Sequence, residues 1–146
     1  MSRTAVTIFS DPAAGDDFDR IGGKLSGQTL SKGAPAYNPL SMRFQAVAGG
    51  KIVGEAITTA NWGKLEVELM YVEPEHRGQG IGRQLMSTVE NFARASKLKA
   101  IRLNTPTWQG VGFYETCGYT EMGRVPLYND KNGNPHFEVT YYKTLD

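Results

Sequence analysis

One stretch near the middle of the chain, residues 71–86, constrains the fold more than any other. An apolar run enters it, glycines follow at Gly78, Gly80 and Gly82, and an amphipathic pattern then begins. Glycines at such a place leave backbone N–H groups exposed at a helix N-terminus, where the helix dipole favours an anion. Arg77 adds a full positive charge beside them. The stretch therefore predicts a strand, a phosphate-binding loop and a helix in succession, the alternative being a tight turn whose glycines serve packing only.

Comparison with known phosphate-binding loops narrows the class of ligand that this loop could bind. A Walker loop needs Gly-Lys-Ser/Thr at its end, whereas Gly82 is followed by Arg83-Gln84. The spacing Gly-x-Gly-x-Gly also differs from the Gly-x-Gly-x-x-Gly dinucleotide fingerprint. The pattern Arg77-x-x-Gly80-x-Gly82 after a strand resembles instead the coenzyme A pyrophosphate loop of the GNAT superfamily of acyl-CoA-dependent N-acyltransferases.

Length and composition limit the classes of protein to which this chain can belong. A length of 146 residues predicts a single domain over residues 1–146 with one substantial core. The formal net charge of +1 offers no electrostatic case for a nucleic-acid or membrane partner. Cys117 is the only cysteine, which excludes an internal disulfide and fits a reducing compartment. Since no apolar run approaches ~20 residues and no signal-peptide pattern is evident, we expect a cytoplasmic protein.

Hydrophobic periodicity and turn residues predict a mixed α+β domain. The predicted elements, in order, are a strand at Ala5–Phe9, a helix begun by Asp11-Pro12 and weakened by its glycines, a loop at Ser26–Pro39, strands at Met42–Ala48, Lys51–Thr59 and Leu65–Val72, a helix at Gly80–Lys97, a strand at Ala100–Asn104, a short helix from about Thr107 to Gly118, and a hairpin of Gly123–Tyr128 and Phe137–Tyr142. The Gly49-Gly50 pair predicts a two-residue hairpin turn with positive φ.

A second motif supports the resemblance. The segment from Gly112 to Tyr119 contains Phe113-Tyr114 followed by Gly118-Tyr119, and it resembles the Phe-Tyr-x-x-x-Gly-Tyr/Phe signature of GNAT enzymes. It lies one helix and one strand after the glycine loop, as in that family. The resemblance covers the chain from Met42 onward and implies the GNAT acyl-CoA N-acyltransferase fold, a central mixed, mostly antiparallel sheet flanked by helices.

The resemblance implies acetyl-CoA as co-substrate and no metal. It suggests that the backbone of Met70, Tyr71 and Val72 pairs with the pantetheine arm and that an N–H near Met70 polarises the thioester carbonyl. The residues implied for the pyrophosphate are Arg77, Gly78, Gln79, Gly80, Ile81, Gly82 and Arg83. Many members carry an Asn seven residues before the helix tyrosine, where this chain has Thr107. The contact of that Asn is therefore absent or made by Thr107, Asn104 or Gln109.

The same resemblance suggests catalytic residues. Tyr114 is the candidate general acid for the leaving thiolate, because a phenol keeps its proton at neutral pH; a buried core tyrosine is the alternative. Glu68, and after it Glu66, are the candidate bases. Residues two apart on a strand share one face of the sheet, so either carboxylate could accept the proton of the amine if that face lines the substrate cleft. Solvated sheet-face charges are the equal alternative for both. We interpret Cys117 as a core residue.

The sequence thus predicts an acetyl-CoA-dependent N-acetyltransferase that acts on a primary amine, favouring a small molecule, by direct transfer in a ternary complex. Two alternatives stay open, a non-catalytic acyl-CoA sensor of the same fold and a protein lysine or N-terminal acetyltransferase. A homodimer is expected only by analogy with the family. Trp62 and Trp108 are either core residues or a wall of the acceptor pocket.

Overall fold

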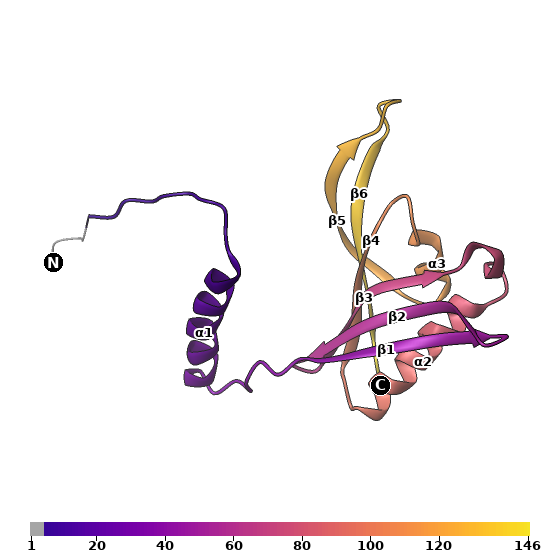
Figure 1. Ribbon diagram of the computed structural model, residues 1–146, viewed down its shortest axis with the longest axis horizontal. Helices are drawn as coiled ribbons and strands as arrows, with labels where there is room; N and C mark the ends of the chain where they lie inside the picture. Colours follow the sequence, from indigo (N-terminus) through magenta and orange to yellow (C-terminus); the bar gives the residue numbers. More distant parts are fainter. Residues whose placement is uncertain (1–4) are drawn as a thin grey trace. The chain divides into compact units, whose positions relative to one another are not determined.

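The computed structural model describes residues 5–146 (Figure 1). Its contacts divide the chain into two compact units, the first ending at Tyr37 and the second running from Asn38 to Asp146. The expectation of one domain over residues 1–146 therefore stays a prediction. The first unit contains one helix, and the second contains the sheet with its helices.

The helix of the first unit, α1 (Gly15–Ser31), begins with a polar cap. The backbone N–H of Ala14 donates to the Asp17 carboxylate at 2.9 Å, and the Asp17 N–H donates to the Ala14 carbonyl at 3.1 Å. These two bonds satisfy backbone groups that a helix start otherwise leaves open. The predicted helix after Asp11-Pro12 is therefore confirmed, with its first turn at Gly15.

Two expectations for this unit are wrong. The sequence predicts a strand at Ala5–Phe9, but these residues have no regular structure, because a strand needs a neighbour and none of the described strands pairs with them. The sequence also predicts that Ser26–Pro39 is a loop with at most a short helical piece, whereas the helix that begins at Gly15 continues without a break to Ser31. Interior glycines cost a helix only about 1 kcal/mol each, which here weakens α1 without ending it.

The second unit is built on one six-stranded sheet with the order β1-β2-β3-β4-β6-β5 (Figure 1). Its strands are β1 (Leu40–Ala48), β2 (Lys51–Asn61), β3 (Lys64–Val72), β4 (Ala100–Pro106), β5 (Thr120–Asn129) and β6 (Pro135–Thr144). All neighbours are antiparallel except β3 and β4. The predicted mixed, mostly antiparallel sheet is confirmed, as is the Gly49-Gly50 turn with φ of 57° and 76°.

Helix α2 (Ile81–Ala95) packs on β1 to β4 and closes the core of this unit. Leu85, Val89 and Ala93 are buried at the predicted helical spacing. Glu90 is buried among them, and its carboxylate pairs with Lys143 on β6. The sequence pattern does not predict this ion pair, since its partners are 53 residues apart.

A β-bulge in β3 changes which of its side chains face the core. The pairing with β2 passes from Val67 to Leu69, so Glu68 is the extra residue. Leu65 and Val67 before the bulge are buried, whereas Leu69 is 66% exposed and Tyr71 54% exposed. In the sequence Val67, Leu69 and Tyr71 are separated by single residues, which in an uninterrupted strand predicts that all three lie on one face. This prediction is wrong because the extra residue reverses the alternation.

Strands β3 and β4 separate after four residue pairs. Their parallel pairing joins Lys64–Val67 to Ala100–Leu103 and ends there, although β3 continues to Val72 and β4 to Pro106. The bulge lies at the point of separation. Beyond it, a short 3-10 helix, η1 (Pro74–His76), leads from β3 into the glycine loop, and α3 (Val111–Thr116) follows β4.

Candidate active site

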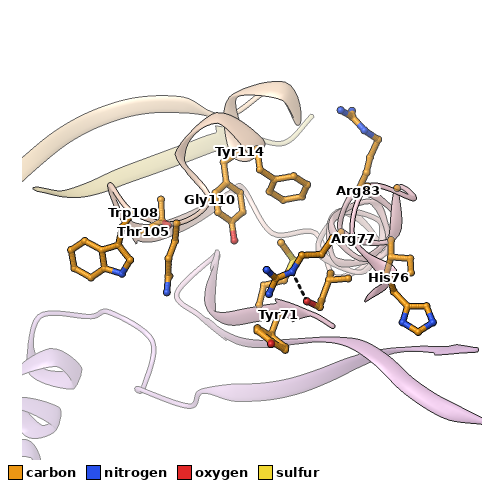
Figure 2. A pocket seen from close by; sticks show the side chains of 16 residues that line it. Tyr71, His76, Arg77, Arg83, Thr105, Trp108, Gly110 and Tyr114 are labelled. Carbon is orange, nitrogen blue, oxygen red and sulfur yellow. Dashed lines mark hydrogen bonds between the residues drawn. The ribbon is translucent and has the colours of Figure 1, made fainter. Parts of the chain in front are cut away.

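A pocket of about 890 Å³ lies where β3 and β4 have separated (Figure 2). Its lining comes from the end of β3, the glycine loop, the start of α2, the segment after β4, and α3. The lining residues are Met70, Tyr71, Val72, His76, Arg77, Gly78, Gly80, Ile81, Gly82, Arg83, Thr105, Trp108, Gln109, Gly110, Phe113 and Tyr114. Of the predicted cofactor residues, Gln79, Asn104 and Thr107 are outside this set.

The glycine loop has the geometry that an anion site needs. Gly78 and Gly80 have φ of 75° and 81°, a left-handed conformation that other residues rarely adopt. Gly80 is the N-cap of α2, and the first helical bond runs from the Gln84 N–H to the Gly80 carbonyl. The N–H groups of the first turn before Gln84 have no acceptor within the helix. They face an open pocket with the positive end of the helix dipole behind them.

The side chain of Arg77 is held against the end of β3. Its Nε donates to the Val72 carbonyl at 2.9 Å, and its guanidinium carbon lies 5.2 Å from the centre of the Tyr71 ring (Figure 2). The Nη groups have no hydrogen bond to any residue in 5–146. Because Nε and the ring fix the side chain, the two Nη groups can donate to an anion in the pocket with little loss of conformational entropy.

Backbone direction in β3 places a free N–H at the pocket. The Val72 carbonyl accepts from Arg77, whereas the next residue, Glu73, donates its N–H to Val53 of β2. Because hydrogen-bonding direction alternates along a strand, the N–H and C=O of Met70 point to the same side as those of Val72. On that side of β3 the pairing with β4 has already ended, at Val67. The Met70 N–H is therefore unpaired by the sheet and faces the pocket.

Tyr114 is buried in an aromatic group, and its hydroxyl points into the pocket (Figure 2). Its ring packs edge-on against Phe113 and Tyr119, with centroid separations of 5.0 and 6.1 Å. A Cβ on Gly110 would lie 2.9 Å from the Tyr114 ring, so glycine is needed there for this packing. Burial, and to a smaller extent the charge of Cys117, raise the pKa of Tyr114 to about 12. The phenol is therefore fully protonated at neutral pH.

The two candidate bases lie in different environments. Glu66 is paired with Arg102 at 3.0 Å and with Lys64 at 3.6 Å, on a part of β3 where the sheet is continuous. Glu68 is exposed at the bulge, two residues before Met70. Neither glutamate lines the pocket. A water between Glu68 and the pocket, or movement of the side chain, is needed for a role as base.

The residues expected to replace the missing Asn are engaged elsewhere. Asn104 accepts a hydrogen bond from the Thr140 hydroxyl at 2.6 Å. The Thr107 hydroxyl oxygen accepts the Phe137 N–H at 3.1 Å and lies 3.0 Å from Nδ1 of His136. Both side chains thus tie β4 to β6. Gln109, the third alternative, lines the pocket.

Several lining residues are missed as site residues by sequence reasoning. His76, Thr105 and Phe113 are the clearest cases. Trp108, which the sequence leaves open as a core residue or a wall of the acceptor pocket, lines the pocket at the end away from His76 (Figure 2). The Nδ1 atom of His76 is buried and has no hydrogen-bond partner in residues 5–146. Two of these four residues have a sequence signal, since Phe113 belongs to the Phe-Tyr motif and Trp108 stands in the Trp108-Gln109 pair that precedes it.

The fold and this pocket define the class of protein. The second motif and the glycine loop both lie in the segment that matches the family described as an acetyltransferase (GNAT) domain, residues 42–121, which is more than half of the chain. The chain therefore belongs to the GNAT acetyltransferase domain family. Residues 5–146 contain no group of His, Cys, Asp and Glu side chains arranged to hold a metal ion, and none of their helices has the length and apolar character of a membrane span.

Several known proteins similar to this chain are named as acetyltransferases. The blasticidin-S acetyltransferase of Streptomyces morookaense is 32% identical over 81 residues, which are 54% of this chain and 59% of that protein. The chain spans less than two thirds of the curated relatives it matches. An acetyltransferase from Bacillus cereus has the same fold, with a TM-score of 0.74 and 21% identity over 94% of this chain and 98% of that one. An aminoglycoside 6'-N-acetyltransferase solved with coenzyme A has a TM-score of 0.59 and 22% identity, over 73% of this chain and 74% of that one.

Proposed function

We propose that this chain transfers an acetyl group from acetyl-CoA to a primary amine, in a ternary complex of both substrates. One observation carries the proposal: a single pocket is lined by the glycine loop at the start of α2, the unpaired edge of β3 and the hydroxyl of Tyr114. These three features match the three charged or polar parts of the reaction, namely the pyrophosphate, the thioester carbonyl and the leaving sulfur.

The residues present fit the co-substrate. The N–H groups at the start of α2 and the Nη groups of Arg77 would hold the pyrophosphate, with Gly78 and Gly80 allowing its close approach. The pantetheine amides would pair with the free edge of β3 from Met70 to Val72. A solved acetyltransferase of the same fold contains coenzyme A, which supports this assignment.

The residues of the pocket supply two hydrogen-bond donors to the reaction. The Met70 N–H would donate to the carbonyl oxygen as negative charge develops on it. The Tyr114 hydroxyl would donate to the sulfur as the C–S bond breaks. Because burial raises the pKa of Tyr114 to about 12, hydrogen-bond donation to the thiolate is favoured over complete loss of the proton.

The amine must lose a proton before attack, since an alkylammonium with a pKa of ~10 is protonated at neutral pH. Glu68 is the first candidate to accept it and Glu66 the second, directly or through a water. The balanced reaction converts acetyl-CoA and an ammonium into the N-acetyl product, free coenzyme A as the thiol, and one proton. The amine nitrogen forms the new bond to the acetyl carbon, and no residue of the chain is acylated.

A small-molecule acceptor is favoured over a protein amine, and the similarity to a blasticidin-S acetyltransferase supports this. The proposal places the reaction in the cytoplasm, which fits a chain whose single cysteine stays a free thiol. A sensor that binds acyl-CoA without turnover is the competing function. Because the enzyme and the sensor would both bind acyl-CoA, only a measurement of acetyl transfer distinguishes them.

Calorimetric titration with acetyl-CoA is the first test, with coenzyme A, ATP and NAD as comparison ligands. We expect saturable binding of the two CoA species only. Release of free thiol is then measured with a panel of primary amines. CoA binding without thiol release for any amine supports the sensor, and absence of CoA binding contradicts both functions.

Removal of the Tyr114 hydroxyl tests its role as hydrogen-bond donor to the leaving sulfur. In Tyr114→Phe we expect kcat to fall by about 100-fold or more, with unchanged affinity for acetyl-CoA, because one transition-state donor is lost. Tyr119→Phe is the matched control, since the Tyr119 hydroxyl is buried nearby without a partner in residues 5–146 and does not line the pocket. Equal kcat in both variants and the wild type would remove Tyr114 from the mechanism.

A further inference from the structure

An aromatic surface continues from the pocket onto the β5–β6 hairpin. The Trp108 ring lies 5.7 Å from the Tyr128 ring and 5.6 Å from the His136 ring, and the Tyr128 and His136 rings are 5.3 Å apart. Trp108 is 51% exposed and Tyr128 is 54% exposed. We call Trp108 and Tyr128 the platform. Two large aromatic side chains that touch, stay half exposed and continue a pocket form a candidate ligand-binding surface.

The platform lies at a defined end of the pocket. Trp108 lines the pocket at the end away from Arg77 and His76, with the Tyr114 hydroxyl between them (Figure 2). In the proposed function the pyrophosphate occupies the Arg77 end and the sulfur lies near Tyr114. The amine acceptor must then approach from the Trp108 end.

His136 is fixed through both ring nitrogens. Its Nε2 lies 3.2 Å from the Asp130 carboxylate, and its Nδ1 lies 3.0 Å from the Thr107 hydroxyl. That hydroxyl oxygen accepts the Phe137 N–H at 3.1 Å, so its own proton can be donated to Nδ1 when the ring is neutral. The ring is then held between the loop after β4, which carries Trp108, and the hairpin, which carries Tyr128.

Asp130 is held in turn by the hairpin loop. One carboxylate oxygen accepts the backbone N–H groups of Asn132 and Asn134, each at 2.9 Å. The other accepts from the Asn134 side chain at 3.2 Å and contacts His136. These bonds hold the hairpin loop around Asp130, and through it the His136 ring that packs against both platform residues.

We propose that Trp108 and Tyr128 bind a planar group of the amine acceptor, and that His136 and Asp130 are positioning residues that keep the platform in place. Stacking on an exposed aromatic face favours a flat ring over a saturated one. The indole N–H of Trp108 has no partner in residues 5–146 and can donate to a polar edge of that ring. This inference rests on the proposed function, since it names the acceptor class of the same site.

Two amines that differ mainly in ring flatness test the platform. Benzylamine and cyclohexylmethylamine are titrated into protein saturated with coenzyme A, and the Trp108 indole N–H signal is followed by NMR. The Trp62→Phe variant identifies which of the two indole signals belongs to Trp108. We expect saturable shifts with benzylamine and at least tenfold weaker binding of cyclohexylmethylamine. Equal affinity, or no shift with benzylamine, overturns the proposal.

Variants separate the platform from the cofactor site. Tyr128→Leu should weaken benzylamine binding about tenfold and leave acetyl-CoA affinity unchanged, because Tyr128 does not line the pocket. Tyr142→Leu, an exposed tyrosine of β6 outside the platform, is the matched control. If the wild type binds benzylamine but not acetyl-CoA, the proposed function fails, and the platform is then a surface that binds planar rings but not an acceptor site. If Tyr128→Leu and wild type bind benzylamine equally, the platform fails alone.

The positioning role has its own readout. His136→Ala should raise the KM for benzylamine with little change in kcat, and His136→Gln should restore part of the loss because its amide can still bond to Asp130 or Thr107. A His136→Ala variant with wild-type KM contradicts the role. A loss of kcat at unchanged KM contradicts it as well, because it indicates a catalytic or general structural effect.

Discussion

Gly80 is constrained by its backbone angle rather than by space. A Cβ at this position would meet no atom within 4 Å, but its φ of 81° is strained for any other residue. In Gly80→Val we expect the loop to change conformation, because the left-handed form costs a non-glycine residue roughly 1–2 kcal/mol. Calorimetry should then show acetyl-CoA affinity reduced about tenfold or more.

Gly112 provides the matched control for that variant. It also has open space around the missing Cβ, but its φ is ordinary and it lies within α3. Gly112→Ala should keep acetyl-CoA affinity and raise the free energy of unfolding by up to about 1 kcal/mol. If Gly80→Val binds acetyl-CoA as Gly112→Ala does, the loop conformation is irrelevant to binding.

At the scale of single residues, the sequence predicts the parts of the site that are local motifs. The glycine loop and Tyr114 come from short patterns, and both line the pocket. Trp108 and His136 could not be assigned, because their environment depends on how β4 meets β6, 28 residues apart in this case. The ion pair of Glu66 with Arg102 could not be predicted either, since Arg102 is brought to it only by strand pairing.

At the scale of elements, α2 is joined to β6 by the ion pair between the buried Glu90 and the half-buried Lys143. The Lys143 ammonium also donates to the Cys117 carbonyl at 3.1 Å. Lys143→Met leaves the Glu90 carboxylate buried without a countercharge, so we expect the free energy of unfolding in urea to fall by about 3–5 kcal/mol. The double variant Glu90→Leu, Lys143→Met should recover most of this loss. Wild-type stability in Lys143→Met alone would contradict the assignment.

Element boundaries in the second unit follow the sequence pattern closely, whereas the bulge does not. Hydrophobic alternation predicts β3, but an inserted residue leaves the composition of the strand unchanged and is visible only through its pairing with β2. The strand expected at Ala5–Phe9 fails for a related reason. A β-rich run predicts the capacity to pair, and it does not predict that a neighbour is present.

At the scale of the whole molecule, three buried tyrosines make stability depend on alkaline pH. Burial raises the pKa of Tyr114 to about 12, burial and a 3.0 Å hydrogen bond to Glu115 raise the pKa of Tyr141 to about 12, and burial raises the pKa of Tyr119 further. In the unfolded chain each phenol ionises near pH 10. The unfolded state then binds fewer protons than the folded state, so stability falls as pH rises above about 10.

We expect the free energy of unfolding to fall between about pH 10 and 12 by up to ~1.4 kcal/mol per pH unit for each such tyrosine. Urea titrations at several pH values measure this slope, and Tyr114→Phe should reduce it by the share of one group. A free energy of unfolding that stays constant from pH 9 to 11.5 would show that the three phenols ionise alike in both states.

The early separation of β3 and β4 also has a mechanical consequence. The half-sheet β1–β3 and the half-sheet β4–β6 are hydrogen-bonded to each other through only four residue pairs, all at the Lys64 and Ala100 end. Such a joint resists sliding along the strands better than it resists opening. A ligand that lies between the separated ends of β3 and β4 and contacts both strands would link the two half-sheets where no backbone hydrogen bonds join them. We therefore expect the two half-sheets to move apart less at that end in the bound protein than in the free protein.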